Sequence, residues 1–258
     1  MGKIIAFANQ KGGVGKTTSA VNIAASLGVL GYKVLMIDLD PQGNATSGVG
    51  VIKKSLKMTA FDLLTTDATV QDVMIKTRFD NLSIIPTNTT LARAEYELAD
   101  VENGEFVIKN KLAPVLDGFD YVIIDCPPSL GMLTVNAMTA ANGVVIPMQC
   151  EFFALEGLGD FLVELRSMRK KLNPSLVIEG VVLTMFDGRT KLAQQITKEV
   201  EDYFGEKLFK TVIPRNIRLV EAPSHGKDIF QYDKRSKGAK AYMSLAEELL
   251  GERKGWLR

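Results

Sequence analysis

The sequence predicts a doubly wound α/β fold, in which a mostly parallel sheet carries helices on both faces. Short β-branched apolar runs alternate with longer helical stretches, the pattern of successive strand–helix units. Most runs are apolar throughout, as expected for strands covered on both faces. The 258 residues are 46% hydrophobic and 24% charged, enough to bury such a core. No linker, repeat or low-complexity tract interrupts the pattern, so we expect one domain over residues 1–258.

The elements follow in order along the chain. Predicted strands occupy residues 3–9, 33–38, 82–86, 121–127, 143–148 and 177–186. Predicted helices occupy residues 15–31, 154–172, 189–205 and 237–252. The first helix starts at a glycine loop and stops at Gly31, and the second ends in basic residues followed by Asn-Pro. Residues 48–80 are less regular and predict small helices within a long excursion.

The segment NQKGGVGKTT, residues 9–18, nearly matches the phosphate-loop pattern GxxxxGK[ST], with Gln10 in place of the first glycine. It follows a predicted strand and opens a helix, which is the context that a phosphate loop requires. Lys16 supplies charge for the β- and γ-phosphates, and the Thr17 hydroxyl is a hard oxygen ligand for Mg²⁺. The helix points its positive end at the same place. The backbone can curl inward because the loop contains Gly12, Gly13 and Gly15. A chance glycine-rich turn is the alternative.

Carboxylates follow two of the predicted strands. Asp38 and Asp40 lie at the carboxyl end of one strand, and Asp125 lies at the carboxyl end of another. Ligands of open α/β sheets gather beyond these strand ends. An aspartate after four apolar strand residues is a usual holder of magnesium-bound water, although a strand-end cap would read the same way.

Five segments together resemble the ParA/MinD family of deviant Walker ATPases, and most closely its chromosome-partitioning ParA (Soj) branch. They are KGGVGKTT, DLDPQGNAT, YVIIDCPPSLG, EFFALEG and VIPRNIRLVEAPSHGK, and the resemblance runs from residue 2 to about 250. It implies a P-loop NTPase fold and an ATPase with the cofactors ATP and Mg²⁺. It also implies a homodimer in the ATP-bound state.

The resemblance also implies roles for individual residues. Lys11, Lys16 and Asp40 would be catalytic, with Asp40 orienting the attacking water. Lys11 would reach across the dimer to the partner's nucleotide, whereas the alternative is a solvated loop charge. The metal residues would be Thr17, Asp38 and Asp125. The nucleotide-binding residues would be Lys11, Gly12, Gly13, Val14, Gly15, Lys16, Thr17 and Thr18, with Pro214, Arg215 and Asn216 beside the adenine.

Charge is uneven in this near-neutral chain, whose formal net charge is +1. Residues 205–240 hold nine Lys/Arg against four acids, a net +5, which leaves −4 for the remainder. Such a region can bind phosphate backbones without base reading, although a solvated face is the alternative. The resemblance implies a DNA-binding surface on the ATP-bound dimer. Its candidates are Arg189 and Arg218, and more weakly Lys210, Lys234, Arg235 and Lys237.

Three functions remain open at this point. The first is a DNA-partitioning ATPase stimulated by a ParB-type partner. The second is a MinD-type membrane-cycling regulator, but Trp256 and Leu257 near the C-terminus do not continue a long apolar face, so we do not expect membrane docking. The third is an ATP-dependent synthetase, for which the sequence shows no substrate-pocket residues.

Cys126 and Cys150 are interpreted as small apolar side chains rather than cluster ligands, because the glycine-flanked context of such ligands is missing. The lone His225 is given a structural or surface role. With two cysteines, no secretory leader and no membrane-length apolar window, we expect a cytoplasmic protein, and the resemblance implies that it associates with the nucleoid.

Overall fold

The computed structural model describes residues 2–79, 81–151 and 154–251, built around a seven-stranded sheet. The sheet order is β3-β4-β2-β5-β1-β6-β7, and only the β3–β4 pair is antiparallel. The strands are β1 (Lys3–Phe7), β2 (Val34–Asp38), β3 (Ile75–Lys76), β4 (Leu82–Ile85), β5 (Tyr121–Asp125), β6 (Gly143–Gln149) and β7 (Val177–Thr184). The predicted doubly wound, mostly parallel fold is therefore confirmed.

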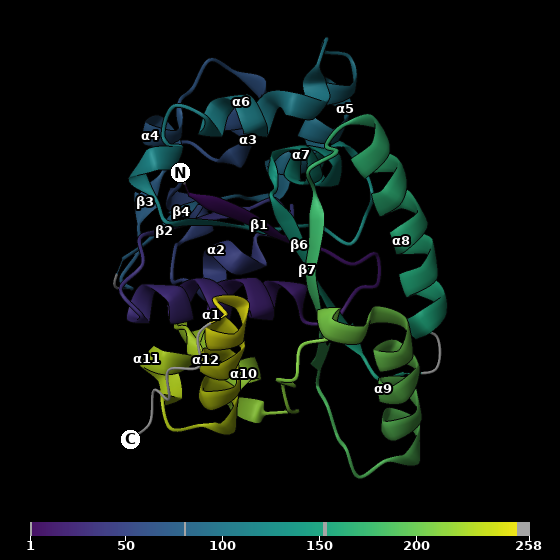
Figure 1. Ribbon diagram of the computed structural model, residues 1–258. Coiled ribbons are helices and arrows are strands. Elements are labelled where there is room, and N and C mark those ends of the chain that lie inside the picture. Colours follow the sequence, from purple (N-terminus) through teal and green to yellow (C-terminus); the bar gives the residue numbers. More distant parts are fainter. Residues whose placement is uncertain (1, 80, 152–153, 252–258) are drawn as a thin grey trace.

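Helices cover both faces of the sheet (Figure 1). On one face α1 packs with α12 around a core that includes Ile23, Tyr242 and Phe7. On the other face α3 to α9 share a second core with the opposite sides of the same strands. The helices are α1 (Lys16–Val29), α2 (Asn44–Gly48), α3 (Ala60–Thr65), α4 (Val70–Val73), α5 (Ala94–Ala99), α6 (Val107–Leu112), α7 (Met132–Ala140), α8 (Ala154–Lys171), α9 (Lys191–Phe204), α10 (Ile217–Glu221), α11 (Ile229–Asp233) and α12 (Lys237–Leu249).

The six predicted strands and four predicted helices are all present, with ends that differ by a few residues. Small helices occupy residues 48–80, as predicted. The sequence pattern did not indicate α7, which buries seven of its nine residues. A helix buried nearly all round lacks the one-sided apolar stripe by which a helix is recognised. It also missed β3, a two-residue edge strand.

The sheet order brings the functional segments together at one edge. Asp125, the last residue of β5, pairs in register with Phe7 at the end of β1 and with Asp38 at the end of β2. The loop after β1 leads directly into α1, so the carboxyl ends of three neighbouring strands meet the start of one helix. This edge is where an open α/β sheet binds its ligands.

Candidate nucleotide site

The loop between β1 and α1 is shaped as an anion cradle. Gly13 and Gly15 take left-handed φ angles of 75° and 86°, which a side chain would strain. A Cβ atom on Gly12 or Gly13 would meet nothing within 4 Å, so the cradle opens onto free space. The N-cap residue of α1 is Gly15, which has no side chain to cap the first N–H groups of the helix, so these donors suit an anion.

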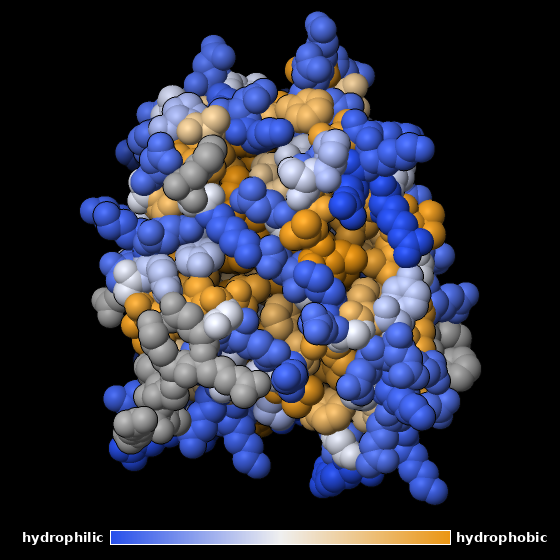
Figure 2. Space-filling view, in the orientation of Figure 1, coloured by the Kyte–Doolittle hydropathy of each residue, from blue (hydrophilic) through white to orange (hydrophobic). Residues whose placement is uncertain are grey.

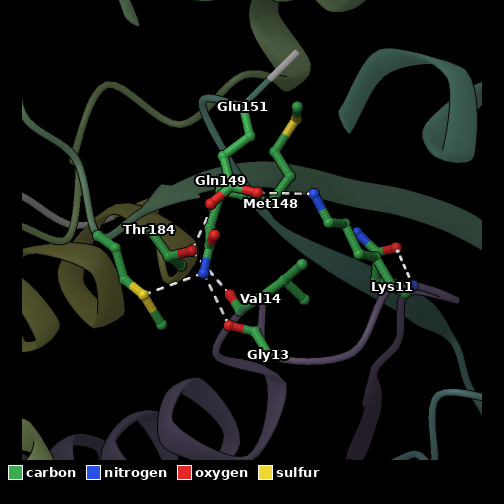
Figure 3. Close-up of polar contacts among 9 residues, drawn as sticks. Lys11, Gly13, Val14, Met148, Gln149, Glu151 and Thr184 are labelled. Atoms are coloured by element: carbon green, nitrogen blue, oxygen red, sulfur yellow. Dashed lines mark hydrogen bonds and ion pairs between the residues drawn. The ribbon is translucent and has the colours of Figure 1, made fainter. Parts of the chain in front are cut away.

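Side chains from the ends of β6 and β7 hold this loop in place (Figure 3). Thr184 Oγ1 donates a hydrogen bond to the Val14 carbonyl at 2.7 Å, and Gln149 Nε2 donates to the Gly13 carbonyl at 2.7 Å. Asn9 Nδ2 donates to the Pro147 carbonyl at 2.8 Å. Side chains at the ends of β6 and β7 thus engage the carbonyls of Gly13 and Val14 and fix this part of the loop. Neither Gln149 nor Thr184 was predicted from the sequence, because both lie within or beside predicted strands.

Lys16 is buried at the first turn of α1. Its Nζ donates to the Lys11 carbonyl at 3.0 Å, and burial lowers the pKa of Lys16, while nearby Asp125, Cys126 and Asp40 oppose that shift. A desolvated ammonium held by one neutral carbonyl has much to gain from a phosphate oxygen.

Asp125 is fully buried, and neither of its carboxylate oxygens has a well-formed hydrogen bond among the described residues, although the Thr17 hydroxyl lies close enough to act on its pKa. Burial raises the pKa of Asp125 well above its usual range, and the adjacent Asp38 carboxylate adds to the shift, while the Thr17 hydroxyl and Lys16 oppose it. Two orphaned, buried oxygens are costly unless something polar completes them. A hydrated Mg²⁺ fits this position.

Asp38 is placed differently from Asp125, although both end their strands. Its Oδ2 accepts from Thr46 N and Thr46 Oγ1, each at 2.7 Å, and its Oδ1 accepts from Asp40 N at 3.2 Å. Burial nevertheless raises the pKa of Asp38 to about 6. With both oxygens engaged by the chain, Asp38 suits a supporting role that holds the start of α2, rather than direct contact with a metal.

Asp40 lies just beyond β2 and is also buried. Its Oδ1 accepts from Gln42 N at 2.9 Å, which fixes the carboxylate in a tight turn. The described residues contain no cluster of three or more His, Cys, Asp or Glu side chains able to hold a metal ion. A magnesium ion at this edge would therefore depend on Thr17, Asp125 and phosphate oxygens together.

A cleft of about 760 Å³ extends from the cradle along the start of α1. The predicted adenine segment lines it, because Phe186 N donates to the Ile213 carbonyl and joins residues 213–216 to the end of β7. Met185 also lines the cleft, with an unusual φ of 48°, and no sequence pattern indicated this position. The other lining residues that the sequence predicted are Gly15, Thr17, Thr18, Pro214, Arg215 and Asn216.

Lys11 does not turn into the cradle. Its Nζ forms an ion pair with Glu151 Oε2 at 2.8 Å, while its backbone N–H donates to Asn9 Oδ1 at 3.0 Å (Figure 3). The side chains of Lys11 and Glu151 are 33% and 52% exposed. Glu151 opens the predicted EFFALEG motif, but the sequence did not indicate its partner.

The predicted DNA-contacting arginines lie on the surface and are paired. Arg189 forms a two-point contact with Asp187, with Nε and Nη2 at 2.8 and 2.6 Å from its oxygens. Arg218 pairs with Glu221 at 2.9 Å and approaches Asp233 at 3.6 Å. The four further basic candidates are exposed: Lys210, Lys234, Arg235 and Lys237.

The remaining candidates are structural. Cys126 is buried, Cys150 is partly buried and His225 is exposed, stacking on Tyr232 at a ring distance of 5.2 Å.

In the view of Figure 2, hydrophilic side chains cover the outer parts of the molecule and hydrophobic ones surface mainly near its middle. Across residues 2–79, 81–151 and 154–251, no helix has the length and apolarity to cross a bilayer.

The fold and this cleft define a P-loop nucleotide-binding protein, and comparison with known proteins narrows the class. Residues 2–178 match a family model described as an AAA domain. The chain is 54% identical to the sporulation initiation inhibitor protein Soj of Bacillus subtilis, over 96% of this chain and 98% of that protein. It is 49% identical to the chromosome-partitioning ATPase Soj of Treponema pallidum, over 97% and 98% of the two chains.

Among solved structures, cobyrinic acid a,c-diamide synthase of Mycobacterium smegmatis with bound ADP and magnesium matches with a TM-score of 0.85. It is 36% identical, and the match covers 97% of this chain and 94% of that one. The chain therefore belongs to the ParA/MinD family of P-loop ATPases, within its Soj/ParA partitioning relatives, as the motifs predicted. It is an ATPase, and its cofactors are ATP and Mg²⁺.

Proposed function

We propose that residues 1–258 form one ATPase domain that acts as a DNA-partitioning switch. ATP would assemble two copies, the dimer would bind non-specific DNA over the nucleoid, and hydrolysis would release it. A ParB-type centromere-binding partner would stimulate that hydrolysis. The near-complete coverage of partitioning relatives at 54% and 49% identity supports this proposal.

One observation carries the dimer part of the proposal, namely the direction of the Lys11 side chain. Lys16 already supplies the ammonium of the cradle, where its Nζ lies against the Lys11 carbonyl. Lys11 instead extends toward Glu151 and remains one-third exposed, so it is accessible to a second molecule (Figure 3). A lysine delivered by a second copy would make hydrolysis depend on assembly, since phosphoryl transfer relies on positioning and charge neutralisation.

Within one subunit, the buried residues would prepare the reaction. Lys16 and the first N–H groups of α1 would bind the phosphates, and Thr17 with Asp125 would hold Mg²⁺. When bound, that ion neutralises charge on the phosphate oxygens. Asp40 would orient the attacking water, and Asp38 would keep Asp40 in place through the hydrogen bond from the Asp40 N–H. Pro214, Arg215 and Asn216 would border the base.

DNA binding would use the surface arginines. Arg189 and Arg218 would contact backbone phosphates, with Lys210, Lys234, Arg235 and Lys237 adding charge around them. A single copy offers one half of this surface, whereas a dimer offers two on one body and gains from effective concentration. ATP binding would thus control DNA affinity without any contact to bases, and the affinity would fall steeply with salt.

The test measures retention on random-sequence DNA with and without Mg-ATP at fixed ionic strength. Wild type should bind only with ATP, and Lys16→Ala should not bind in either condition because it loses the nucleotide. Arg189→Glu should still dimerise with ATP yet lose DNA, whereas Arg93→Glu, a charge reversal of an exposed arginine outside the basic region, should behave as wild type. ATP-independent DNA binding by wild type would contradict the gating.

Two alternative functions can be distinguished from DNA partitioning with the same purified protein. A MinD-type membrane cycle would require the C-terminal segment, but Trp256 and Leu257 lie outside the described residues. Vesicle sedimentation with ATP addresses it directly, because binding to vesicles but not to DNA would replace our proposal. The 36% identical synthase structure is compatible with a synthetase, but the more similar partitioning relatives favour DNA partitioning.

A further inference from the structure

Two side chains of one short segment hold two separate points of the phosphate loop. Gln149 Nε2 donates to the Gly13 carbonyl at 2.7 Å and to Met185 Sδ at 3.0 Å. Two residues later, Glu151 Oε2 accepts from Lys11 Nζ at 2.8 Å (Figure 3). Residues 149–151 therefore reach the loop at both its backbone and its exposed lysine.

These two contacts differ in what they require of the loop. Gln149 bonds a backbone carbonyl, and this bond can persist while the cradle is occupied. Glu151 instead engages the one group of the loop, the Lys11 ammonium, that our proposed function sends to another molecule. One lysine cannot remain within 2.8 Å of its own Glu151 and also reach the nucleotide of a second copy. The two states of Lys11 must exclude each other.

We propose that Glu151 is a positioning residue that retains Lys11 on its own subunit until a second copy bearing nucleotide draws it away. This inference rests on the proposed function of Lys11 in the dimer. The contact weakens the dimer without preventing assembly, because both partners are partly exposed. Surface ion pairs of this kind shift an equilibrium by only about two- to fivefold.

The symmetry of a dimer makes the small effect measurable. Two copies assemble by releasing two Lys11–Glu151 contacts, so the dissociation constant carries the square of the single effect, about 4- to 25-fold. The affinity of one copy for nucleotide should change little, because the Lys11 side chain does not enter its own cradle. A split between dimerisation and nucleotide affinity is therefore the sign of this role.

The experiment compares Glu151→Gln with wild type, both in an Asp40→Ala background that blocks hydrolysis. Sedimentation with Mg-ATP gives the dimer dissociation constant, and a fluorescent nucleotide gives the affinity of the monomer. Glu151→Gln should tighten the dimer about 4- to 25-fold and leave nucleotide affinity unchanged. The matched control is Glu102→Gln, which removes the same charge from an exposed position and should change neither value.

A Lys11→Ala background completes the cycle, because Glu151→Gln should have no effect on the dimer once its partner is gone. An unchanged or weaker dimer in Glu151→Gln with Lys11 present overturns the inference, and the weaker dimer would mean that Glu151 contacts the second copy instead.

A second measurement keeps the inference testable even where the proposed function fails. Acylation of Lys11 in the nucleotide-free monomer, followed by mass spectrometry, should be about two- to fivefold faster in Glu151→Gln, with exposed Lys54 as the internal standard. Equal labelling overturns the inference. Faster labelling in a protein that never dimerises with ATP would retain the contact and reject the proposed function.

Discussion

The nucleotide edge and the basic surface carry charge in opposite ways. At the edge, Lys16, Asp38 and Asp125 are buried, and neither Asp125 oxygen has a well-formed hydrogen bond among the described residues. On the surface, Arg189 and Arg218 are exposed and already paired with carboxylates of their own chain. A buried charge has lost its contact with water, so a ligand of opposite charge that reaches it is strongly stabilised. Exposed charge exchanges one partner for another at little gain, so it suits reversible binding that a second event must reinforce.

We expect the largest effect at Asp40, the fixed carboxylate that we propose orients the attacking water. Asp40→Ala should retain ATP and slow hydrolysis by about 10²- to 10⁴-fold, the usual contribution of a positioned acid–base or water-orienting group. The variant should also remain on DNA once ATP has loaded it. Phosphate release and DNA retention on the same sample check both parts, with the exposed Asp67→Ala as control. Loss of ATP binding in Asp40→Ala would place this residue in binding rather than in turnover.

A second, intermediate effect concerns the cost of the buried carboxylates before any ligand arrives. Burial raises the pKa of Asp125 well above its ordinary value and that of Asp38 to about 6. A carboxyl with a raised pKa in the folded state binds more protons there than in the unfolded chain. The free energy of unfolding of the nucleotide-free protein should therefore rise as the pH falls from 8 through 6 toward 4.

Asp125→Asn removes one of these charges and keeps the side-chain shape. At pH 8 it should stabilise the nucleotide-free protein by about 1 to 3 kcal/mol and flatten the pH dependence. It should also lose the added stability that Mg-ADP gives to wild type. Urea unfolding at pH 5, 6.5 and 8 measures all three quantities. If the variant were less stable than wild type at pH 8 and had the same pH slope, the Asp125 carboxylate would have favourable partners in the nucleotide-free protein, and our account of its burial would be wrong.

The edge was largely predictable from the sequence because its signals are local. The glycines, Lys16 and Thr17 lie within one loop, and each aspartate directly follows or ends an apolar run. The partners of these residues were not predictable. Glu151 lies 140 positions from Lys11, and only the packing of β6 beside β1 brings the two together. Both oxygens of Asp38 accept hydrogen bonds from the chain, whereas neither Asp125 oxygen has a well-formed one among the described residues. This difference also depends on the position of α2, which carries Thr46.

The positive charge of the basic surface was predictable from the sequence, but the ion pairs made by its arginines were only partly so. Asp187 stands two residues before Arg189, a local signal in the segment DGR that charge counting overlooked. Asp233 and Arg218 are 15 positions apart and meet only through the packing of α10 against α11.

We expect the smallest effect on this surface, where the charges are exposed and paired with carboxylates of the same chain. Arg189 lowers the pKa of Asp187 to about 2, so the carboxylate stays charged and paired throughout neutral pH. Under the proposed function, DNA phosphate would have to displace this carboxylate from Arg189. Asp187→Asn should raise the DNA affinity of the ATP-bound dimer by about two- to fivefold for each arginine released. The gain should disappear in an Arg189→Ala background, where no guanidinium remains to be freed.

Asp100→Asn, the same charge change at an exposed site at the end of α5, separates this release from a general gain in positive charge. A salt titration separates them further, because a phosphate contact steepens the dependence of log affinity on log salt by about 0.9, whereas a distant charge adds little slope. Equal gains from Asp187→Asn and Asp100→Asn would mean that the exposed pairs are immaterial to DNA. The surface would then act through net charge alone, and the difference between the two regions would be one of burial and not of pairing.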